Sequence, residues 1–132
     1  MSARDRSQPA GYWLTLASED LACATIILAL DGTQPRHSVG LSAQAAEKAL
    51  KAAVAATGAV PPRSHDLVAL AHRSGAILGT VTHHDLRRLS DAHEQSRYPE
   101  SSEELFGVEE AVELAQVAKV IVDEMLAVLQ PG

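Results

Sequence analysis

The stretch that decides the fold is residues 43–52, which read AQAAEKALKA. Alanine is its commonest residue, and alanine has the highest intrinsic helix propensity of all residues. Upstream, Thr33 is suited to cap a helix whose first turn accepts Pro35, because no amide donor is missed there. Downstream, Thr57 and Gly58 end the pattern. The sequence therefore predicts one long helix that starts after Thr33 and lasts until Thr57 and Gly58.

A second helix is predicted before this one, over about 11–30. Its apolar residues recur at helical spacing, at Trp13, Ala17, Leu21, Ala24 and Leu28. Asp31 and Gly32 then break it. The most apolar run, 21–30, is far shorter than the roughly 20 residues that a membrane crossing needs. We therefore expect a core helix and no membrane association.

Two shorter helices are predicted after the stiff connection around Pro61. Ser64 is expected to cap a helix over 65–73, which Gly75 stops. Thr82, with Asp85 three residues on, resembles a capping box, in which each residue's side chain bonds the other's backbone amide. That pair predicts a further helix over about 83–95, with Leu86 and Leu89 directed inward.

A surface loop and a long last helix complete the chain. Residues 98–107 contain a proline, two serines and three glutamates, a composition typical of loops. The helix after them, 108–129, carries an unusually wide apolar stripe. Its members are Val108, Ala111, Ala115, Ala118, Val122, Met125 and Leu129, extended sideways by Leu114, Val117, Ile121 and Val128.

The width of this stripe bears on the oligomeric state. It fits a helix that packs into its own bundle on one side and against a second copy on the other. We therefore expect a homodimer through the 108–129 face. The alternative is a central helix that is buried within a single copy.

Composition agrees with one all-α domain. Aromatic residues make up 3% of the chain, and β-branched residues seldom alternate with polar ones, so strand signals are weak. Hydrophobic residues at 46% and charged residues at 21% are sufficient for a buried core. We predict a single domain over 1–132, an up-and-down bundle of four main helices plus a short helix, with 1–9 and 130–132 flexible.

Charge and cysteine usage restrict the function. The 17 acidic and 11 basic side chains give a formal net charge of -6, which argues against a broad nucleic-acid-binding surface. Any phosphate contact must then be a local basic patch. Cys23 is the only cysteine, so an intramolecular disulfide and a cysteine-built zinc site are excluded. Since the N-terminus lacks the apolar stretch of a secretory signal, a cytoplasmic location is expected.

The densest candidate for phosphate binding lies on the helix that contains 43–52. Gln44, Lys48 and Lys51 fall at i, i+4 and i+7 and therefore share one side of that helix. Two ammonium groups and an amide there are suited to grip a phosphate. The alternative is that Glu47 pairs with Lys51 at i+4 and Lys48 is a solvated charge.

A second candidate is the triplet Arg97-Tyr98-Pro99 at the end of the predicted 83–95 helix. Arg97 is suited to bind phosphate, and Tyr98 to stack on a base, next to a proline that fixes the backbone direction. The alternative is structural: Arg97 stabilises the C-terminal end of the helix, and Tyr98 covers the edge of the core.

The six histidines do not form a metal motif by their spacing. His83 and His84 are adjacent, and adjacent residues on a helix point about 100° apart, so they make a poor pair of ligands for one ion. The chain contains no H-E-x-x-H motif, no glycine-rich phosphate loop and no G-x-S-x-G turn. The sequence therefore predicts no metal site and no cofactor.

Taken together, these segments resemble the HEPN superfamily, specifically the small prokaryotic HEPN proteins usually encoded beside a minimal nucleotidyltransferase. The resemblance rests on Tyr12-Trp13 with Ala17, Asp20 and Leu21, on the string at 43–52, on His65-Asp66-Leu67, on Arg97-Tyr98-Pro99, and on the alanine-rich last helix. It covers nearly the whole chain.

This resemblance implies a dimeric bundle that handles a nucleotide or RNA, in many relatives as the toxin of a toxin-antitoxin pair. Ribonuclease members of the family use an arginine followed after four to six residues by a histidine, placed where the two subunits meet. The formal match in this chain is Arg88 with His93, and Arg87 lies one residue farther from the same histidine.

The sequence thus predicts a dimeric HEPN subunit that binds a nucleotide or a nucleic-acid segment and docks a nucleotidyltransferase partner, to which catalysis would belong. The residues expected to make the binding site are Gln44, Lys48, Lys51, His65, Arg97 and Tyr98. One alternative is metal-independent RNA cleavage, with His93 as general base or acid and Arg88 on the scissile phosphate. The other is a pure protein-interaction module.

Overall fold

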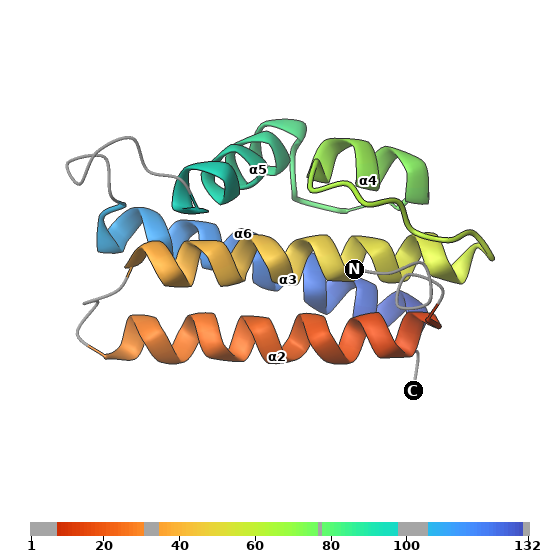
Figure 1. Cartoon of the computed structure of the whole chain (residues 1–132), viewed down its shortest axis with the longest axis horizontal. Helices are drawn as coiled ribbons and strands as arrows, with labels where there is room; N and C mark the ends of the chain where they lie inside the picture. Colours follow the sequence, from red (N-terminus) through yellow and green to blue (C-terminus); the bar gives the residue numbers. More distant parts are fainter. Residues whose placement is uncertain (1–7, 31–34, 77, 98–105, 131–132) are drawn as a thin grey trace.

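The computed structural model describes residues 8–30, 35–76, 78–97 and 106–130 of the chain. Within these ranges the protein contains five α-helices and no strand (Figure 1). They are α2 (Ala10–Ala29), α3 (Pro35–Ala56), α4 (Leu67–Ser74), α5 (His83–Arg97) and α6 (Val108–Leu129). The predicted all-α bundle of four main helices and a short one is confirmed, and each predicted helix is present within about two residues of its expected bounds.

Helix α3 is the centre of the arrangement, because it contacts each of the other four described helices. Figure 1 shows α2 along one side of α3 and the pair α4 and α5 along the opposite side. Helix α6 packs against α3 and also reaches α2. Residues on different sides of α3 therefore meet different helices.

Small side chains on α3 allow this close packing. Its fully buried apolar positions are mostly alanines, together with Val39, Leu50 and Val54. Gly40 is one turn from the start of the helix, and a Cβ there would lie 3.2 Å from Ser96 Oγ on α5, tighter than most real contacts. The backbones of α3 and α5 approach closely at this point, which fixes the position of the last turn of α5.

Local capping signals explain where the shorter helices begin and end. The capping box before α5 is present, with Thr82 N donating to Asp85 Oδ2 and Asp85 N donating to Thr82 Oγ1, both at 3.0 Å. Gly75 ends α4 in the left-handed region, at φ 69°. The predicted cap of α4 at Ser64 is wrong. Asp66 caps that helix, since its Oδ1 accepts from Val68 N at 3.0 Å and from Ala69 N at 3.2 Å.

The apolar stripe on α6 is used mostly inside the single chain. Its buried members, Ala111, Leu114, Ala118, Ile121, Val122 and Met125, face the bundle. Val108, Val112 and Val128 remain exposed on the same helix. The alternative of a helix buried within one copy therefore accounts for most of the stripe.

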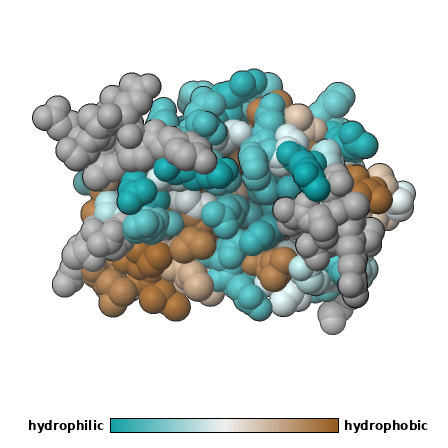
Figure 2. Space-filling view, in the orientation of Figure 1, coloured by the Kyte–Doolittle hydropathy of each residue, from teal (hydrophilic) through white to brown (hydrophobic). Residues whose placement is uncertain are grey.

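Helix α2 leaves a larger apolar surface uncovered. Ile26 and Leu30, at its C-terminal end, are 59% and 62% exposed. Figure 2 shows a contiguous hydrophobic area at the lower left of the molecule, where Figure 1 places this end of α2. Among the described helices, α2 alone is long and apolar enough to span a bilayer. Its residues Trp13, Leu14, Ala17 and Ala24 are buried in the core.

Several sequence expectations fall on residues outside the described ranges. They include the Thr33 cap, most of the predicted loop at 98–107, and nearly all of the predicted flexible termini. Phe106, at the end of that loop, is described and is buried against the core.

Ser64 and Asp66, which both precede α4, provide a matched test of the cap. Asp66→Ala is expected to lower the free energy of unfolding by about 1 kcal/mol, because two helix amides lose their acceptor. Ser64→Ala should cost clearly less, since Ser64 Oγ accepts only from the Asp66 amide and from no helix amide. Urea denaturation of both variants measures the difference, and an equal or larger loss in Ser64→Ala would contradict the assignment.

Candidate functional site

A buried carboxylate on α3 is the centre of the candidate site. Glu47 is 6% exposed, and both of its oxygens are engaged. Its Oε2 accepts from Lys51 Nζ at 3.0 Å, one turn further along α3. Its Oε1 lies 2.6 Å from His65 Nδ1, which comes from the segment before α4. A charge at this depth requires such partners, because an unpaired buried carboxylate costs several kcal/mol.

Lys51 belongs to the interior of the protein. It is 2% exposed, and its ammonium lies 5.8 Å from the centroid of the buried Trp13 ring. The alternative considered from the sequence is therefore right about the pairing of Glu47 with Lys51. It is wrong about Lys48, which pairs with Asp20 and is not a solvated charge. Lys51 compensates a buried carboxylate and does not face solvent.

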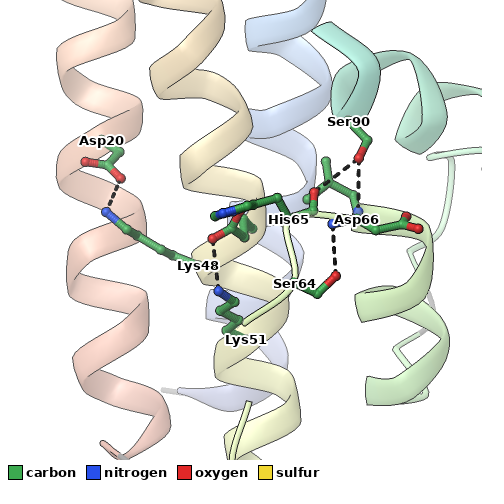
Figure 3. Close-up of polar contacts among 9 residues, drawn as sticks. Asp20, Lys48, Lys51, Ser64, His65, Asp66 and Ser90 are labelled. Carbon is green, nitrogen blue, oxygen red and sulfur yellow. Dashed lines mark hydrogen bonds and ion pairs between the residues drawn. The ribbon is translucent and has the colours of Figure 1, made fainter. Parts of the chain in front are cut away.

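The segment that carries His65 is held against α5 by one hydroxyl group. Ser90 Oγ donates to the His65 carbonyl at 3.1 Å and accepts from Leu67 N at 3.3 Å. Ser64 Oγ accepts from Asp66 N at 3.1 Å on the other side of the same turn (Figure 3). The His65 backbone is thus fixed by α5, while its side chain reaches back to α3.

A second histidine lies next to the first. His93 on α5 is 5% exposed, and its ring meets that of His65 edge to face, with centroids 5.5 Å apart and planes at 87°. Burial lowers the pKa of the His93 imidazole, and His65 and Arg97 act in the same direction, against the opposing effect of Glu47 and Glu94. This lowered pKa favours the uncharged form of the His93 ring near neutral pH.

The two histidines open into a shallow depression beside α5. Its volume is about 290 Å³, near the lower end of the range for small-molecule sites, roughly 300 Å³. It is lined by His65, His93, Arg87 and Arg97, with Asp66, Asp91 and Glu94 among the surrounding side chains. Two guanidinium groups and two imidazoles therefore share one hollow, with acidic groups near them.

The structure separates the three residues predicted to form a phosphate patch on α3. Figure 3 shows Lys48 extending to Asp20 of α2, where Nζ and Oδ2 are 2.6 Å apart, while Lys51 lies on the side of His65. Gln44 lines another hollow, together with Arg36 and Arg97. The three residues share one side of α3 but do not form one site, because α2 covers one part of that side and α5 covers another.

The residues predicted at the end of α5 are described in part. Arg97 is the last residue of α5 and lines both the depression with His93 and the hollow with Gln44. The backbone before it is fixed by Arg36 of α3, whose Nη1 donates to the Ser96 carbonyl at 2.9 Å. Tyr98 and Pro99 lie outside the described residues.

Arg88 and His93, the predicted ribonuclease pair, face different surroundings. Arg88 Nη2 lies 2.6 Å from Glu113 Oε2 and 3.8 Å from Glu110 Oε2, so its guanidinium is turned toward α6. Arg87, the neighbouring candidate, lines the depression that contains His93. Adjacent helical residues point about 100° apart, which accounts for the different directions of the two arginines.

A potential metal-binding set was missed by the sequence analysis. Glu47, His65 and His93 each offer one ligand atom, and these atoms lie within 4.8 Å of one another. The three residues belong to α3, the segment before α4, and α5, so no local spacing links them. The available signal was Glu47 itself, a carboxylate between Ala43 and Leu50 on an apolar side of its helix, where a charge needs a partner.

The fold and the site define an all-α bundle protein with a carboxylate-histidine cluster between α3 and α5. Residues 10–128 match the family model described as the HEPN domain. The chain therefore belongs to the HEPN family, as its sequence resemblance indicated. Neither a curated protein nor a solved structure matches the chain.

The two lysines of α3 provide a matched test of the buried carboxylate. Lys51→Met is expected to lower the free energy of unfolding by about 3–5 kcal/mol, because it leaves Glu47 buried without its cation. Lys48→Met should cost less than about 1 kcal/mol, since the Lys48–Asp20 pair is partly exposed to solvent. Urea denaturation compares the two variants, and similar losses would show that Lys51 does not compensate Glu47.

Proposed function

We propose that this HEPN protein binds a nucleotide or a short nucleic-acid segment in the depression beside α5. The observation that supports this most directly is that Arg87, Arg97, His65 and His93 line one hollow. A guanidinium presents a planar fork of donors that matches a phosphate, and imidazoles add further hydrogen-bonding groups.

The acidic surroundings define the size of the ligand that fits. The chain has a net charge of -6, and Asp91 and Glu94 lie near the arginines. The Asp66 carboxylate is engaged in capping α4. Such a site suits one or two phosphate groups with an attached nucleoside, and it repels a long phosphate backbone. Compared with the sequence prediction, Arg87 and His93 join His65 and Arg97, whereas Lys48 and Lys51 make their contacts elsewhere.

We also propose that the protein partners a minimal nucleotidyltransferase, as a component of a toxin-antitoxin pair. The support for this is the resemblance carried by residues 43–52, 65–67 and 97–99 to HEPN proteins encoded beside such enzymes. In this arrangement the bound nucleotide lies near the partner, and group transfer belongs to the partner's active site.

RNA cleavage is a second candidate function, favoured by the contact between the two histidines. The lowered pKa of His93 favours its uncharged ring, which lies 5.5 Å from that of His65, whose orientation Glu47 fixes. One imidazole as general base would take the proton of a ribose 2′-hydroxyl, whose oxygen then attacks the phosphorus. The other would protonate the departing 5′-oxygen. Arg87, in place of Arg88, would hold the phosphate.

A comparison of variants at the adjacent residues Arg87 and Arg88 distinguishes binding in the depression from a general effect of positive charge. We expect adenosine triphosphate or a short single-stranded RNA to raise the melting temperature of the chain, because a ligand that binds only the native state stabilises it. Arg87→Ala should weaken binding by about 10-fold or more, the usual effect of losing a charge-assisted hydrogen bond. Arg88→Ala, which removes the same charge but contacts Glu113, should bind like the unchanged protein.

The same samples distinguish the remaining functions. RNA that is shortened after incubation without divalent cations, and intact with His93→Ala, would favour the ribonuclease. Equal weakening by Arg87→Ala and Arg88→Ala would contradict binding in this depression. The absence of any shift with all ligands would leave the protein-interaction module as the better description.

We propose further that the protein is a homodimer. The wide apolar stripe of α6 first suggested this, but only Val108, Val112 and Val128 of that helix remain largely exposed. Ile26 and Leu30, at the C-terminal end of α2, are also exposed. Figure 1 places the end of α2 and the start of α6 at the same end of the bundle. The apolar area at the end of α2 supports a dimer surface there, since large exposed apolar areas are typical of subunit interfaces.

Substitutions at the two ends of the bundle test this dimer surface. The double change Ile26→Glu and Leu30→Glu should convert the dimer to a folded monomer, because it would bury charges at the interface. Val128→Glu is the control, since Val128 is equally exposed but lies at the opposite end of α6. Sedimentation equilibrium measures the masses. A monomeric unchanged protein, or dissociation by Val128→Glu alone, would exclude this surface.

A further inference from the structure

Three side chains from three separate segments converge below the depression. Glu47 comes from the middle of α3, His65 from the segment before α4, and His93 from the last half of α5. One ligand atom from each lies within 4.8 Å of the other two. Two further contacts hold the cluster in place: Lys51 donates to Glu47, and Ser90 donates to the His65 carbonyl.

The donor chemistry of this cluster is that of a transition-metal site. Two imidazole nitrogens and one carboxylate oxygen are the ligand set that zinc uses when it keeps a fourth position open. Imidazole donors favour zinc, copper or nickel over magnesium and calcium, which prefer oxygen alone. Around a tetrahedral zinc ion with bonds of about 2.0–2.1 Å, neighbouring ligand atoms lie roughly 3.3 Å apart.

The geometry is close to this requirement. Glu47 Oε1 and His65 Nδ1, now 2.6 Å apart in a hydrogen bond, would separate by less than about 1 Å to admit an ion between them. The most distant ligand atoms, up to 4.8 Å apart, would approach by somewhat more. The His65 side chain is 59% exposed, so its rotation can supply the part of this movement that involves His65.

The charged groups around the cluster act on a bound cation in both directions. Lys51 donates to Oε2 of Glu47, which leaves Oε1 for the ion and fixes the orientation of the carboxylate, as outer partners do in metal sites. The positive charges of Lys51, Arg87 and Arg97 oppose the ion, whereas the carboxylates of Asp66, Asp91 and Glu94 near the depression favour it. Because His65 is exposed, the ion can enter and its open position would face solvent.

We propose that Glu47, His65 and His93 bind one divalent transition-metal ion of the zinc class. The ion would join α3, α5 and the segment before α4 through direct bonds, and so stabilise the packing of the α4 and α5 layer on α3. This site does not depend on nucleotide binding: a chain that binds zinc and no nucleotide would support it fully.

The experiment uses the full chain after treatment with a chelator. Isothermal titration with zinc chloride is expected to show one tight site per chain, and cobalt chloride should give the strong visible absorption of a four- or five-coordinate ion. His65→Ala should weaken zinc binding by more than about 100-fold, since loss of an outer partner alone costs roughly 10–100-fold. This variant should fold, because Glu47 keeps Lys51 as its cation and the backbone contacts of residue 65 remain.

His72→Ala is the matched control, since His72 is an exposed histidine at the end of α4 and outside the cluster. It should bind zinc like the unchanged protein. Circular dichroism is the control that both variants are folded. The proposal is overturned if the unchanged chain binds no zinc at micromolar concentration, or if His65→Ala binds it as tightly. An equal loss in His72→Ala would also overturn it, because it would indicate scattered surface binding.

Discussion

The compensation of one buried carboxylate is the constraint on which the rest of the site depends. Glu47 lies inside an alanine-rich helix, where an isolated charge would cost several kcal/mol. Lys51 supplies a cation from the next turn, but the second oxygen needs a donor from elsewhere. His65 provides it, and to do so the chain after α3 must return along α3 before α4 begins. Ser90 then holds this segment to α5. The layer of α4 and α5 is thus positioned by the same contacts that satisfy the charge.

The alanines of α3 make this arrangement sterically feasible. A central helix with large side chains would hold its neighbours farther away, whereas α3 is contacted by four helices. The backbones approach closely enough for Ser38 Oγ to donate to the Ala24 carbonyl of α2, and for Gly40 to lie against Ser96 of α5. The contacts of Gly40 and Arg36 with Ser96 hold the end of α5 against α3. The residues on the inner side of α5, including His93, therefore keep a fixed relation to Glu47.

Much of the fold could be predicted from the sequence, because its signals are local. The capping box at Thr82 and Asp85, the left-handed Gly75 and the bounds of α6 each depend on residues a few positions apart. The choice of Ser64 over Asp66 as a cap failed because both are good caps and only the actual start of α4 distinguishes them. The site could not be predicted in the same way. Its main contact, between Glu47 and His65, joins residues 18 positions apart, and helical spacing does not say which helix covers a given side.

Neighbouring cations in this chain illustrate the same limit for function. Arg87 and Arg88 are adjacent, yet Arg88 is turned to the glutamates of α6, while Arg87 lines the depression with His93. Lys48 and Lys51 likewise neutralise carboxylates on different sides of α3. With 17 acidic and 11 basic residues, most cations of this protein can find a carboxylate. The orientation of each basic side chain on its packed helix determines whether that side chain can contact a phosphate. A binding surface in an acidic protein therefore follows from the packing of its helices and not from the number of its basic residues.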